Sequence, residues 1–166
     1  ARRHLVEAEN LAYHAQQELA LLIQELRPLA LQDKELAVAL QEYIATWSRQ
    51  SGIGADLRVA DVGVLPLQVE EALWRVAQEA LSNVVRHSHA TSVRVSLACE
   101  HGKVTLAIMD NGQGFDTSTA HRSGVGLHSM QERIGLLGGT VTVESKLEEG
   151  TYILVECPIM GTDDKG

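Results

Sequence analysis

Residues 66–88 read PLQVEEALWRVAQEALSNVVRHS, and this stretch combines an apolar helical stripe with a row of polar groups. The proline at its start suits the first turn of a helix. The apolar residues that recur at helical spacing are Leu73, Ala77, Ala80 and Val84. Glu79, Asn83 and His87 are four residues apart, and Arg86 is three residues after Asn83. These polar side chains therefore share one flank of the predicted helix.

The row of polar side chains suits a metal ion together with phosphate. The Glu79 carboxylate and the Asn83 amide oxygen, one turn apart, are ligands for a hard cation such as Mg²⁺ that keeps most of its waters and bridges phosphates. Arg86 and His87 would donate hydrogen bonds to phosphate oxygens. Taken alone, the row is explained better as a solvated helix face.

A second motif, DNGQGF at residues 110–115, follows an alternating stretch from Val104 to Met109 that predicts a half-buried strand. A buried carboxylate at the end of this strand requires a partner, and the exocyclic amine of adenine is a suitable donor to Asp110. Gly112 and Gly114 would let the backbone approach a flat base. The alternative is an Asp-Asn-Gly hairpin turn.

A third motif, SGVGL at residues 123–127, opens another stretch with helical spacing of apolar residues. Glycines ahead of a helix present free backbone amides to an anion, and the polar segment 116–122 before them predicts a mobile flap. The alternative is a plain glycine-containing loop. Neither glycine pair extends to Gly-x-Gly-x-x-Gly, because Thr117 and Ser129 stand where the third glycine of that motif would be. No P-loop motif occurs either.

Together, the three motifs resemble those of the catalytic and ATP-binding domain of bacterial sensor histidine kinases, in the superfamily shared with DNA gyrase, Hsp90 and MutL. The most similar subfamily is that of the nitrate sensors and the DesK-like sensors. Residues 78–87 resemble the N box, whose asparagine binds magnesium. Residues 110–115 resemble the first glycine box, whose aspartate reads adenine, and residues 124–130 resemble the second, at the hinge of the ATP lid. The pair Gly150-Thr151 resembles a Gly-Thr pair beside the same adenine.

The resemblance covers roughly residues 50–160 and implies a role for each motif. Asp110 and Thr151 would hold adenine, and Asn83 would hold Mg²⁺, with Glu79 acting on the metal through water. Glu79 and Asn83 are the implied catalytic residues. The implied ATP-binding residues are Asn83, Arg86, His87, Asp110, Gly112, Gly114, Phe115, Gly124, Val125, Gly126, Leu127, His128 and Thr151.

The implied reaction is phosphoryl transfer from Mg-ATP to a histidine, followed by relay to an aspartate of a response regulator. Such a reaction depends mainly on in-line positioning and charge neutralisation, and the lid at 116–123 would order when the γ-phosphate is present. Two alternatives remain at this stage: a magnesium-dependent ATPase in which Glu79 activates water, and a non-catalytic nucleotide-binding or dimerisation module. An anti-sigma serine kinase of the same superfamily is disfavoured by the helix that precedes the domain.

That preceding segment has the heptad pattern of a bundle or coiled-coil helix. The apolar positions are Leu5, Ala8, Ala12, Ala15, Leu19, Leu22 and Leu26. Pro28 ends the pattern, and the segment resembles the second helix of the dimerisation and phosphotransfer hairpin, which implies a homodimer in the full-length protein. The predicted organisation is a partial hairpin at 1–28, a connector helix at 29–52, the ATP-binding domain at 53–160 and a disordered tail at 161–166.

The phosphoacceptor histidine of the subfamily precedes an acidic residue. Here His4 is followed by Leu5 and His14 by Ala15, so neither fits. The chain also begins with alanine, and we expect it to be a piece of a longer sensor. It should bind ATP without completing autophosphorylation alone.

Composition limits the partners of the chain. It has 166 residues and a formal net charge of -8, which argues against nucleic acid as a partner. No apolar run approaches the ~20 residues of a membrane span, so we expect a cytoplasmic domain whose membrane attachment, if any, lies in other regions. Cys99 and Cys157 are expected to be reduced, buried thiols.

The predicted order of elements gives an α+β fold class. After two helices come a strand near 56–61, the motif helix, two strands joined at 100–102, a further helix, and an antiparallel pair near 140–146 and 151–158. The family resemblance implies a two-layer α/β sandwich, the Bergerat ATP-binding fold, with a mixed sheet, helices on one face and a long N-terminal bundle helix before it.

Overall fold

The computed structural model describes residues 7–8, 10–15, 28–120 and 125–159. Two compact units divide the chain, Ala1–Lys34 and Glu35–Gly166. In the first unit, residues 10–15 are helical and exposed, and Pro28, with extended backbone, precedes the short 3-10 helix η1, Leu29–Leu31. Most of the predicted bundle helix and all of the predicted tail at 161–166 lie outside the described residues.

The second unit is a sheet with helices. Its elements in chain order are α2 (Leu36–Ser51), β1 (Gly54–Ala60), α3 (Leu67–Asn83), the π-helix η2 (Val84–Ser88), β2 (Ser92–Glu100), β3 (Lys103–Asp110), α4 (Thr117–Ala120), α5 (Val125–Gly135), β4 (Thr140–Lys146) and β5 (Gly150–Pro158). The strand order is β1-β2-β3-β5-β4, with β1 parallel to β2 and every other pair antiparallel. The predicted α+β class with a mixed sheet is confirmed.

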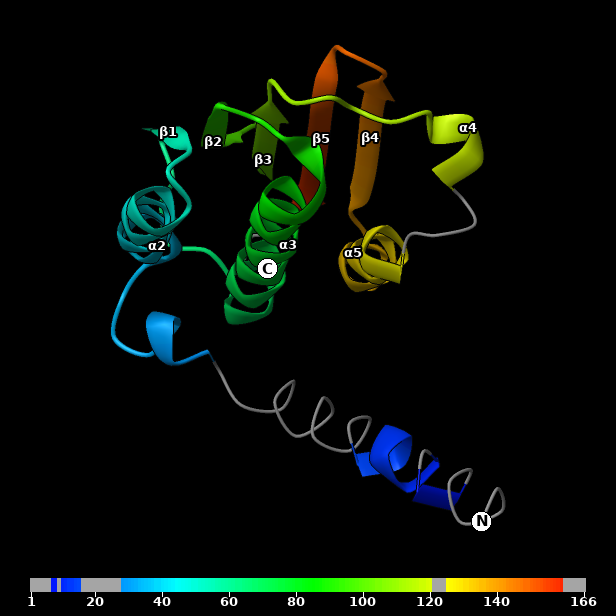
Figure 1. Ribbon diagram of the computed structural model, residues 1–166. Helices are drawn as coiled ribbons and strands as arrows, with labels where there is room; N and C mark the ends of the chain where they lie inside the picture. The colour runs from blue at the N-terminus through cyan, green and yellow to red at the C-terminus, as the bar shows by residue number, and fades with distance from the viewer. Residues whose placement is uncertain (1–6, 9, 16–27, 121–124, 160–166) are drawn as a thin grey trace, which may run out of the picture. The chain divides into compact units, whose positions relative to one another are not determined.

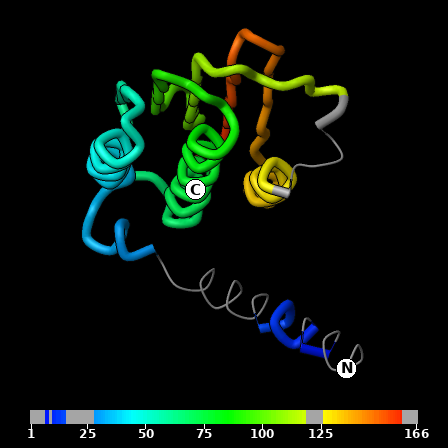
Figure 2. The backbone as a smooth tube through the Cα atoms, in the orientation of Figure 1, coloured from blue at the N-terminus to red at the C-terminus, as the bar shows by residue number. Residues whose placement is uncertain are grey.

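The helices α2, α3 and α5 lie side by side against one face of this sheet (Figure 1), and the backbone trace shows the same layer (Figure 2). Helix α2 contacts β1, α3 crosses β3 and β5, and α5 contacts β4. None of the helices in the described part of the chain is long and apolar enough to cross a membrane.

The core lies between these two layers because each strand alternates its side chains. The buried strand residues are Val93, Val95, Leu97, Val104, Leu106, Ile108, Ile153, Val155 and Cys157. They face the predicted apolar stripe, whose members are all buried: Leu73, Ala77 and Ala80 on α3, and Val84 at the start of η2. Burying an aliphatic side chain of this size contributes roughly 1.5–3 kcal/mol, so this contact fixes α3 over the middle of the sheet.

The predicted helix at 66–88 is divided into α3 and η2. The Ser88 hydroxyl donates to the carbonyl of Val84 (2.9 Å) and accepts the N–H of Ala90 (3.1 Å), and His89 then turns the chain with a left-handed φ of 53°. The helix therefore ends in a π turn, which has one residue more than an α turn, and this end lies beside the cleft described below.

The predicted helix at 29–52 is divided as well, because Leu29–Leu31 forms η1 and α2 begins only at Leu36. β1 begins at Gly54 because the Gly54 N–H donates to the carbonyl of Thr91 and pairing with β2 continues from there. Both cysteines are free; Cys157 is buried, but Cys99 is only half-buried because it lies one residue before the end of β2.

Candidate functional site

A cleft of about 1020 Å³ lies between α3, α5 and the ends of β3 and β5. Most of the predicted site residues line it: Glu79, Asn83, Arg86, His87, Asp110, Gly114, Phe115, Gly126, Leu127 and Thr151. Small-molecule sites typically enclose about 300–1,000 Å³, so the cleft has room for a nucleotide. The sequence motifs, dispersed over 73 positions from Glu79 to Thr151, thus meet in one place.

The closed end of the cleft contains Asp110, the last residue of β3, which is 6% exposed. Its Oδ1 accepts the N–H of Gly112 at 2.9 Å. Burial raises the pKa of this carboxyl, and hydrogen bonds from the backbone of Gly112 and Thr151 oppose that rise. Thr151 is the register partner of Asp110 on β5. A buried acceptor beside a threonine hydroxyl suits a ligand that donates hydrogen bonds.

The segment after Asp110 is not the hairpin turn that the sequence left open, because β3 pairs next with β5 rather than with a strand that follows directly. Asn111 instead holds the start of β2: its Oδ1 accepts the N–H groups of Thr91 (2.9 Å) and Ser92 (3.0 Å), and its Nδ2 donates to the Thr91 hydroxyl (2.8 Å).

The glycines of this segment are required by the protein backbone itself. A Cβ added at Gly112 would overlap the carbonyl oxygen of Ser88, and one at Gly114, where φ is +61°, would overlap the carbonyl oxygen of Lys146. Gly112 does not line the cleft but donates to Asp110. The two glycines let the chain pass close to its neighbours and so bring Asp110 and Phe115 to the cleft wall.

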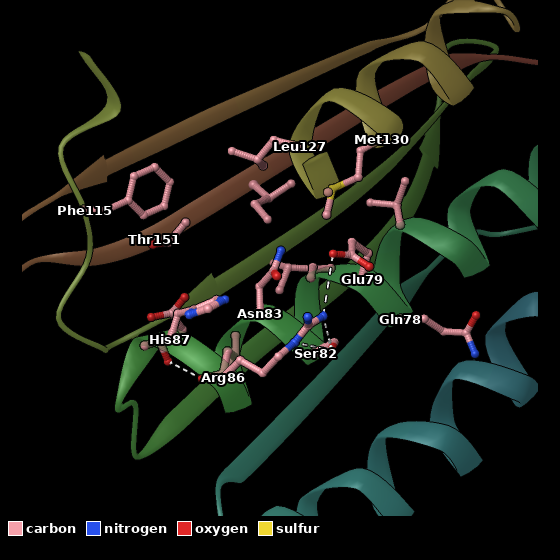
Figure 3. Close-up of a pocket in the computed structure, with 18 of the residues that line it drawn as sticks. Gln78, Glu79, Ser82, Asn83, Arg86, His87, Phe115, Leu127, Met130 and Thr151 are labelled. Atoms are coloured by element: carbon pink, nitrogen blue, oxygen red, sulfur yellow. Dashed lines mark hydrogen bonds and ion pairs between the residues drawn. The ribbon is translucent and has the colours of Figure 1, made fainter. Parts of the chain in front are cut away.

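The polar row predicted on α3 lies along the opposite wall (Figure 3). Arg86 donates to the Ser82 hydroxyl through Nε (3.1 Å) and Nη2 (2.7 Å), and its Nη2 lies 3.8 Å from Glu79 Oε1. Figure 3 shows Asn83 pointing from α3 into the cleft, opposite Thr151 and Phe115. Among the described residues, no hydrogen bond engages the Asn83 side-chain amide, so its oxygen is available to a ligand or metal.

Glu79 lies against the first turn of α5. A Cβ added at Gly126 would overlap the end of the Glu79 side chain, which shows how closely the carboxylate approaches this turn. Helix N-termini carry a partial positive charge and unpaired N–H groups. The carboxylate therefore lies in a region that favours anions, close to the amides that the third motif was predicted to offer to phosphate.

These donors fit a magnesium ion that retains its waters. Within the described ranges no group of three or more His, Cys, Asp and Glu residues could hold a metal alone. Asn83 and Glu79 supply two oxygen donors one helical turn apart, and Mg²⁺ is commonly bound by one or two such groups together with phosphates and water. The residues present therefore fit a metal that arrives with the nucleotide.

Three functional candidates were missed by sequence reasoning. Ser145 lies beside Thr151, near the Asp110 end of the cleft, and its hydroxyl accepts the N–H of Phe115 at 2.9 Å. The sequence feature that could have identified Ser145 is its spacing: it is a polar residue on the same, less exposed face of β4 as Val141 and Val143. Arg75 and Arg133 line the cleft. Burial lowers the pKa of Arg133, and the nearby charge of Arg75 lowers that pKa further.

Some predicted positions lie elsewhere. His128 is exposed and does not line the cleft; its Nε2 lies 3.2 Å from Glu132 Oε1. Val125 is the first residue of α5, and Gly124 lies outside the described residues. The described part of the predicted flap contains the short helix α4, where Asp116 accepts hydrogen bonds from the Ser118 N–H (2.9 Å) and hydroxyl (2.6 Å), which lower the pKa of Asp116.

Comparison with known families gives a match over most of the second unit. The family model described as "Histidine kinase-, DNA gyrase B-, and HSP90-like ATPase" matches residues 68–160. Sensor histidine kinase LiaS of Bacillus subtilis is 37% identical over 158 residues, which are 95% of this chain and 43% of LiaS. The histidine-protein kinase/phosphatase DegS of Brevibacillus brevis is 36% identical over 143 residues, 86% of this chain and 37% of DegS. The chain thus spans less than half the length of these relatives.

Solved structures of similar fold include the histidine kinase domain of the blue-light activated kinase EL346 of Erythrobacter litoralis, with a TM-score of 0.61 and 20% identity over 75% of this chain and 61% of that one. The histidine kinase AdeS of Acinetobacter baumannii aligns with a TM-score of 0.61 and 18% identity, covering 76% of this chain and 64% of AdeS. At these identities the likeness concerns the fold, and it agrees with the fold predicted from the sequence.

Proposed function

We propose that this chain, which belongs to the histidine kinase-, DNA gyrase B-, and HSP90-like ATPase family, supplies the ATP-binding catalytic domain of a two-component sensor histidine kinase. The family membership confirms the resemblance drawn from the motifs. The observation that carries the proposed site is the single cleft that joins the Asp110 end to the polar row of α3 and the N-terminus of α5.

Adenine occupies the closed end in this proposal. The Asp110 carboxylate and the Thr151 hydroxyl accept hydrogen bonds from the exocyclic amine, and apolar walls surround the base. Ile108, Ile153 and Met130 supply such walls, since all three are buried and line the cleft. A base that carries an oxygen in place of the amine would leave the buried carboxylate without a donor, which is costly in a site of this kind.

The triphosphate extends from the base along α3 toward the N-terminus of α5. Asn83 holds Mg²⁺ through its amide oxygen, and Glu79 acts on the metal shell through water. The metal neutralises charge on the phosphate oxygens when it is bound. Arg86, His87 and the backbone amides near Gly126 bind the phosphates, and the lid at 116–123, of which residues 121–123 lie outside the described residues, is expected to order when the γ-phosphate is present.

The phosphoryl acceptor is a histidine outside this chain, and the phosphoryl group then passes to a response regulator. Support comes from the curated relatives, which are named as histidine kinases and are more than twice as long as the matched region. Ala8, Ala12 and Ala15, which belong to the predicted heptad pattern, are exposed and suit a dimer contact through the N-terminal helix. In this proposal the domain is cytoplasmic, and any membrane anchor belongs to the rest of the sensor.

Calorimetric titration with Mg-ATP and Mg-GTP tests the proposed site. Asp110→Ala should lower ATP affinity roughly 10- to 100-fold, as expected for loss of hydrogen bonds to a charged group. The matched control is Asp56→Ala, because Asp56 is an exposed aspartate on β1 paired only with its neighbour Arg58. Equal binding of ATP and GTP, or equal loss in both variants, would contradict the assignment of the adenine pocket.

A magnesium-dependent ATPase is the second candidate, and the position of Glu79 at the N-terminus of α5 favours it. A carboxylate inside the cleft could orient water toward the γ-phosphate. Steady release of phosphate from Mg-ATP without any acceptor, lost in Glu79→Gln, would support hydrolysis as the main activity. Negligible release by the isolated chain would favour transfer to the absent histidine.

A further inference from the structure

The hydroxyl of Ser145 joins three segments at the base end of the cleft. It accepts the N–H of Phe115, donates to the carbonyl of Gly150, and lies against the hydroxyl of Thr151, each at 2.9 Å. Ser145 belongs to β4, Gly150 and Thr151 begin β5, and Phe115 follows the first glycine motif. Of these residues Thr151 and Phe115 line the cleft, whereas Ser145 lies behind them.

Counting protons determines how these hydroxyls are oriented. A serine hydroxyl has one proton to donate and two lone pairs to accept. The N–H of Phe115 takes one lone pair of Ser145, and the carbonyl of Gly150, which can only accept, takes its proton. The remaining contact is a hydrogen bond only if the Thr151 hydroxyl donates to the second lone pair of Ser145. All three contacts are satisfied in that single arrangement.

In this arrangement the proton of the Thr151 hydroxyl points away from the cleft, toward β4. Its oxygen then offers only lone pairs to a ligand. The neighbouring ionised Asp110 also has only acceptors to offer. Both polar side chains at the base end therefore require a donor, and a 6-amino group supplies one. A 6-oxo group would face acceptors on both sides.

We propose that Ser145 is a positioning residue that sets the base selectivity of the site by holding the proton of the Thr151 hydroxyl. The inference rests on the proposed function, since it concerns the same nucleotide cleft. Without the Ser145 hydroxyl, Thr151 can rotate its proton into the cleft and donate to a 6-oxo group. Selectivity for the 6-amino base should then fall, although neither Thr151 nor Asp110 has changed.

The test compares binding of Mg-ATP with Mg-inosine triphosphate, whose bases differ in the 6-amino or 6-oxo group and the associated proton at N1. Wild type should prefer ATP, and Ser145→Ala should narrow the ratio of the two Kd values roughly 5- to 50-fold, the range expected for loss of one buried hydrogen-bond constraint. Ser145→Thr keeps a hydroxyl at this place and should restore the ratio. In a Thr151→Val background, Ser145→Ala should leave the ratio unchanged, because Ser145 acts through Thr151.

Other outcomes separate this inference from the proposed function. If Ser145→Ala weakens both nucleotides equally, or if the ratio changes as much in the Thr151→Val background, the positioning role is wrong. Equal binding of both nucleotides by wild type overturns the inference while leaving a nucleotide site in place. Absence of any nucleotide binding by the folded wild-type chain overturns the proposed function itself. Should Ser145→Ala fail to fold, Ser145→Thr and Thr151→Val are compared with wild type instead. Ser145→Thr should keep the wild-type ratio of the two Kd values, and Thr151→Val should narrow it; any other result would contradict the inference.

Discussion

Burial in the cleft disfavours the ionised form of the Asp110 carboxyl. Burial raises its pKa above the ordinary 3.8, despite two backbone hydrogen bonds. A group with a raised folded-state pKa contributes stability that is present below its ordinary pKa and lost as pH rises through the folded pKa. At neutral pH the ionised Asp110 therefore lowers the free energy of unfolding. A site that recognises a base through this carboxylate is less stable for that reason.

We therefore expect Asp110→Asn to melt at a higher temperature than wild type at pH 7 in the absence of nucleotide. The amide resembles the protonated carboxyl and carries no charge at any pH. The difference in Tm should shrink as pH falls toward 3.8, the ordinary pKa of the group. Thermal unfolding across this range measures it, and a variant that is less stable by the same amount at every pH would refute the argument.

The glycine at position 114 is fixed by backbone packing rather than by a ligand. Its φ is +61°, and a Cβ there would overlap the carbonyl of Lys146. Gly114→Ala should lower the free energy of unfolding by about 2–4 kcal/mol, as expected for a strained position with a steric overlap. Gly63→Ala is the matched control, because a Cβ at Gly63 meets no heavy atom within 4 Å. Urea unfolding that gives equal values for both variants would contradict this reading.

Sequence reasoning reached Asp110 and Thr151 through the motifs that carry the family resemblance, but it could not reach Ser145. The contacts of Ser145 depend on the register of β4 with β5, in which Ser145 is opposite Thr151. The Phe115 N–H comes from a segment 30 residues earlier. Such a meeting is set by pairing across the sheet, which local patterns do not specify.

At the scale of elements, Asn111 ties the end of β3 to the start of β2 with its three side-chain hydrogen bonds to Thr91 and Ser92. Asn111→Ala removes all three and should lower the free energy of unfolding by about 1–3 kcal/mol. Asn111→Asp keeps both acceptor contacts and loses only the donor to Thr91, so its effect should be smaller. Chemical denaturation of the two variants measures the order, and an equal loss in both would mean that the backbone holds this junction without the side chain.

The helices, the strands and the antiparallel pairs β2–β3 and β4–β5 followed from the sequence, whereas the pairing of β1 with β2 and of β3 with β5 did not. The apolar stripe of residues 66–88 predicted α3 and η2 as one helix, and the alternation from Val104 to Met109 predicted β3. β4 forms the edge of the sheet, and β5 turns back from it to pair with β3 on its other side. Long-range pairing of this kind depends on which apolar faces can be buried together, and every strand here offers a similar face.

At the scale of the whole molecule, a chain of net charge -8 offers an anionic ligand a cleft lined by Arg75, Arg86 and Arg133. Arg75 and Arg133 are half-buried and Arg86 is exposed, and charges within a cleft are screened less by salt than distant charges on the surface. The three arginines supply positive charge to a cleft that the carboxylates of Glu79 and Asp110 also line. The residual charge of the nucleotide still requires a cation, which connects the electrostatics of the fold to the metal.

The last prediction concerns that cation and the stability of the folded unit. A ligand at 100 times its Kd stabilises the state that binds it by about 2.7 kcal/mol, so Mg-ATP should raise the Tm of the chain clearly, and ATP with a chelator should raise it less. Asn83→Ala should abolish the rise in Tm that Mg²⁺ adds and should not change the rise in Tm that ATP gives without Mg²⁺. The reason is that the amide oxygen of Asn83 is the proposed metal ligand, and the side chain makes no hydrogen bond within the described residues. Six melting curves, without nucleotide, with ATP alone and with ATP and Mg²⁺ for wild type and variant, complete this cycle. Retention of the full Mg²⁺ increment in the variant would mean that the metal is held elsewhere, and the assignment of Asn83 would fail while the adenine pocket would stand.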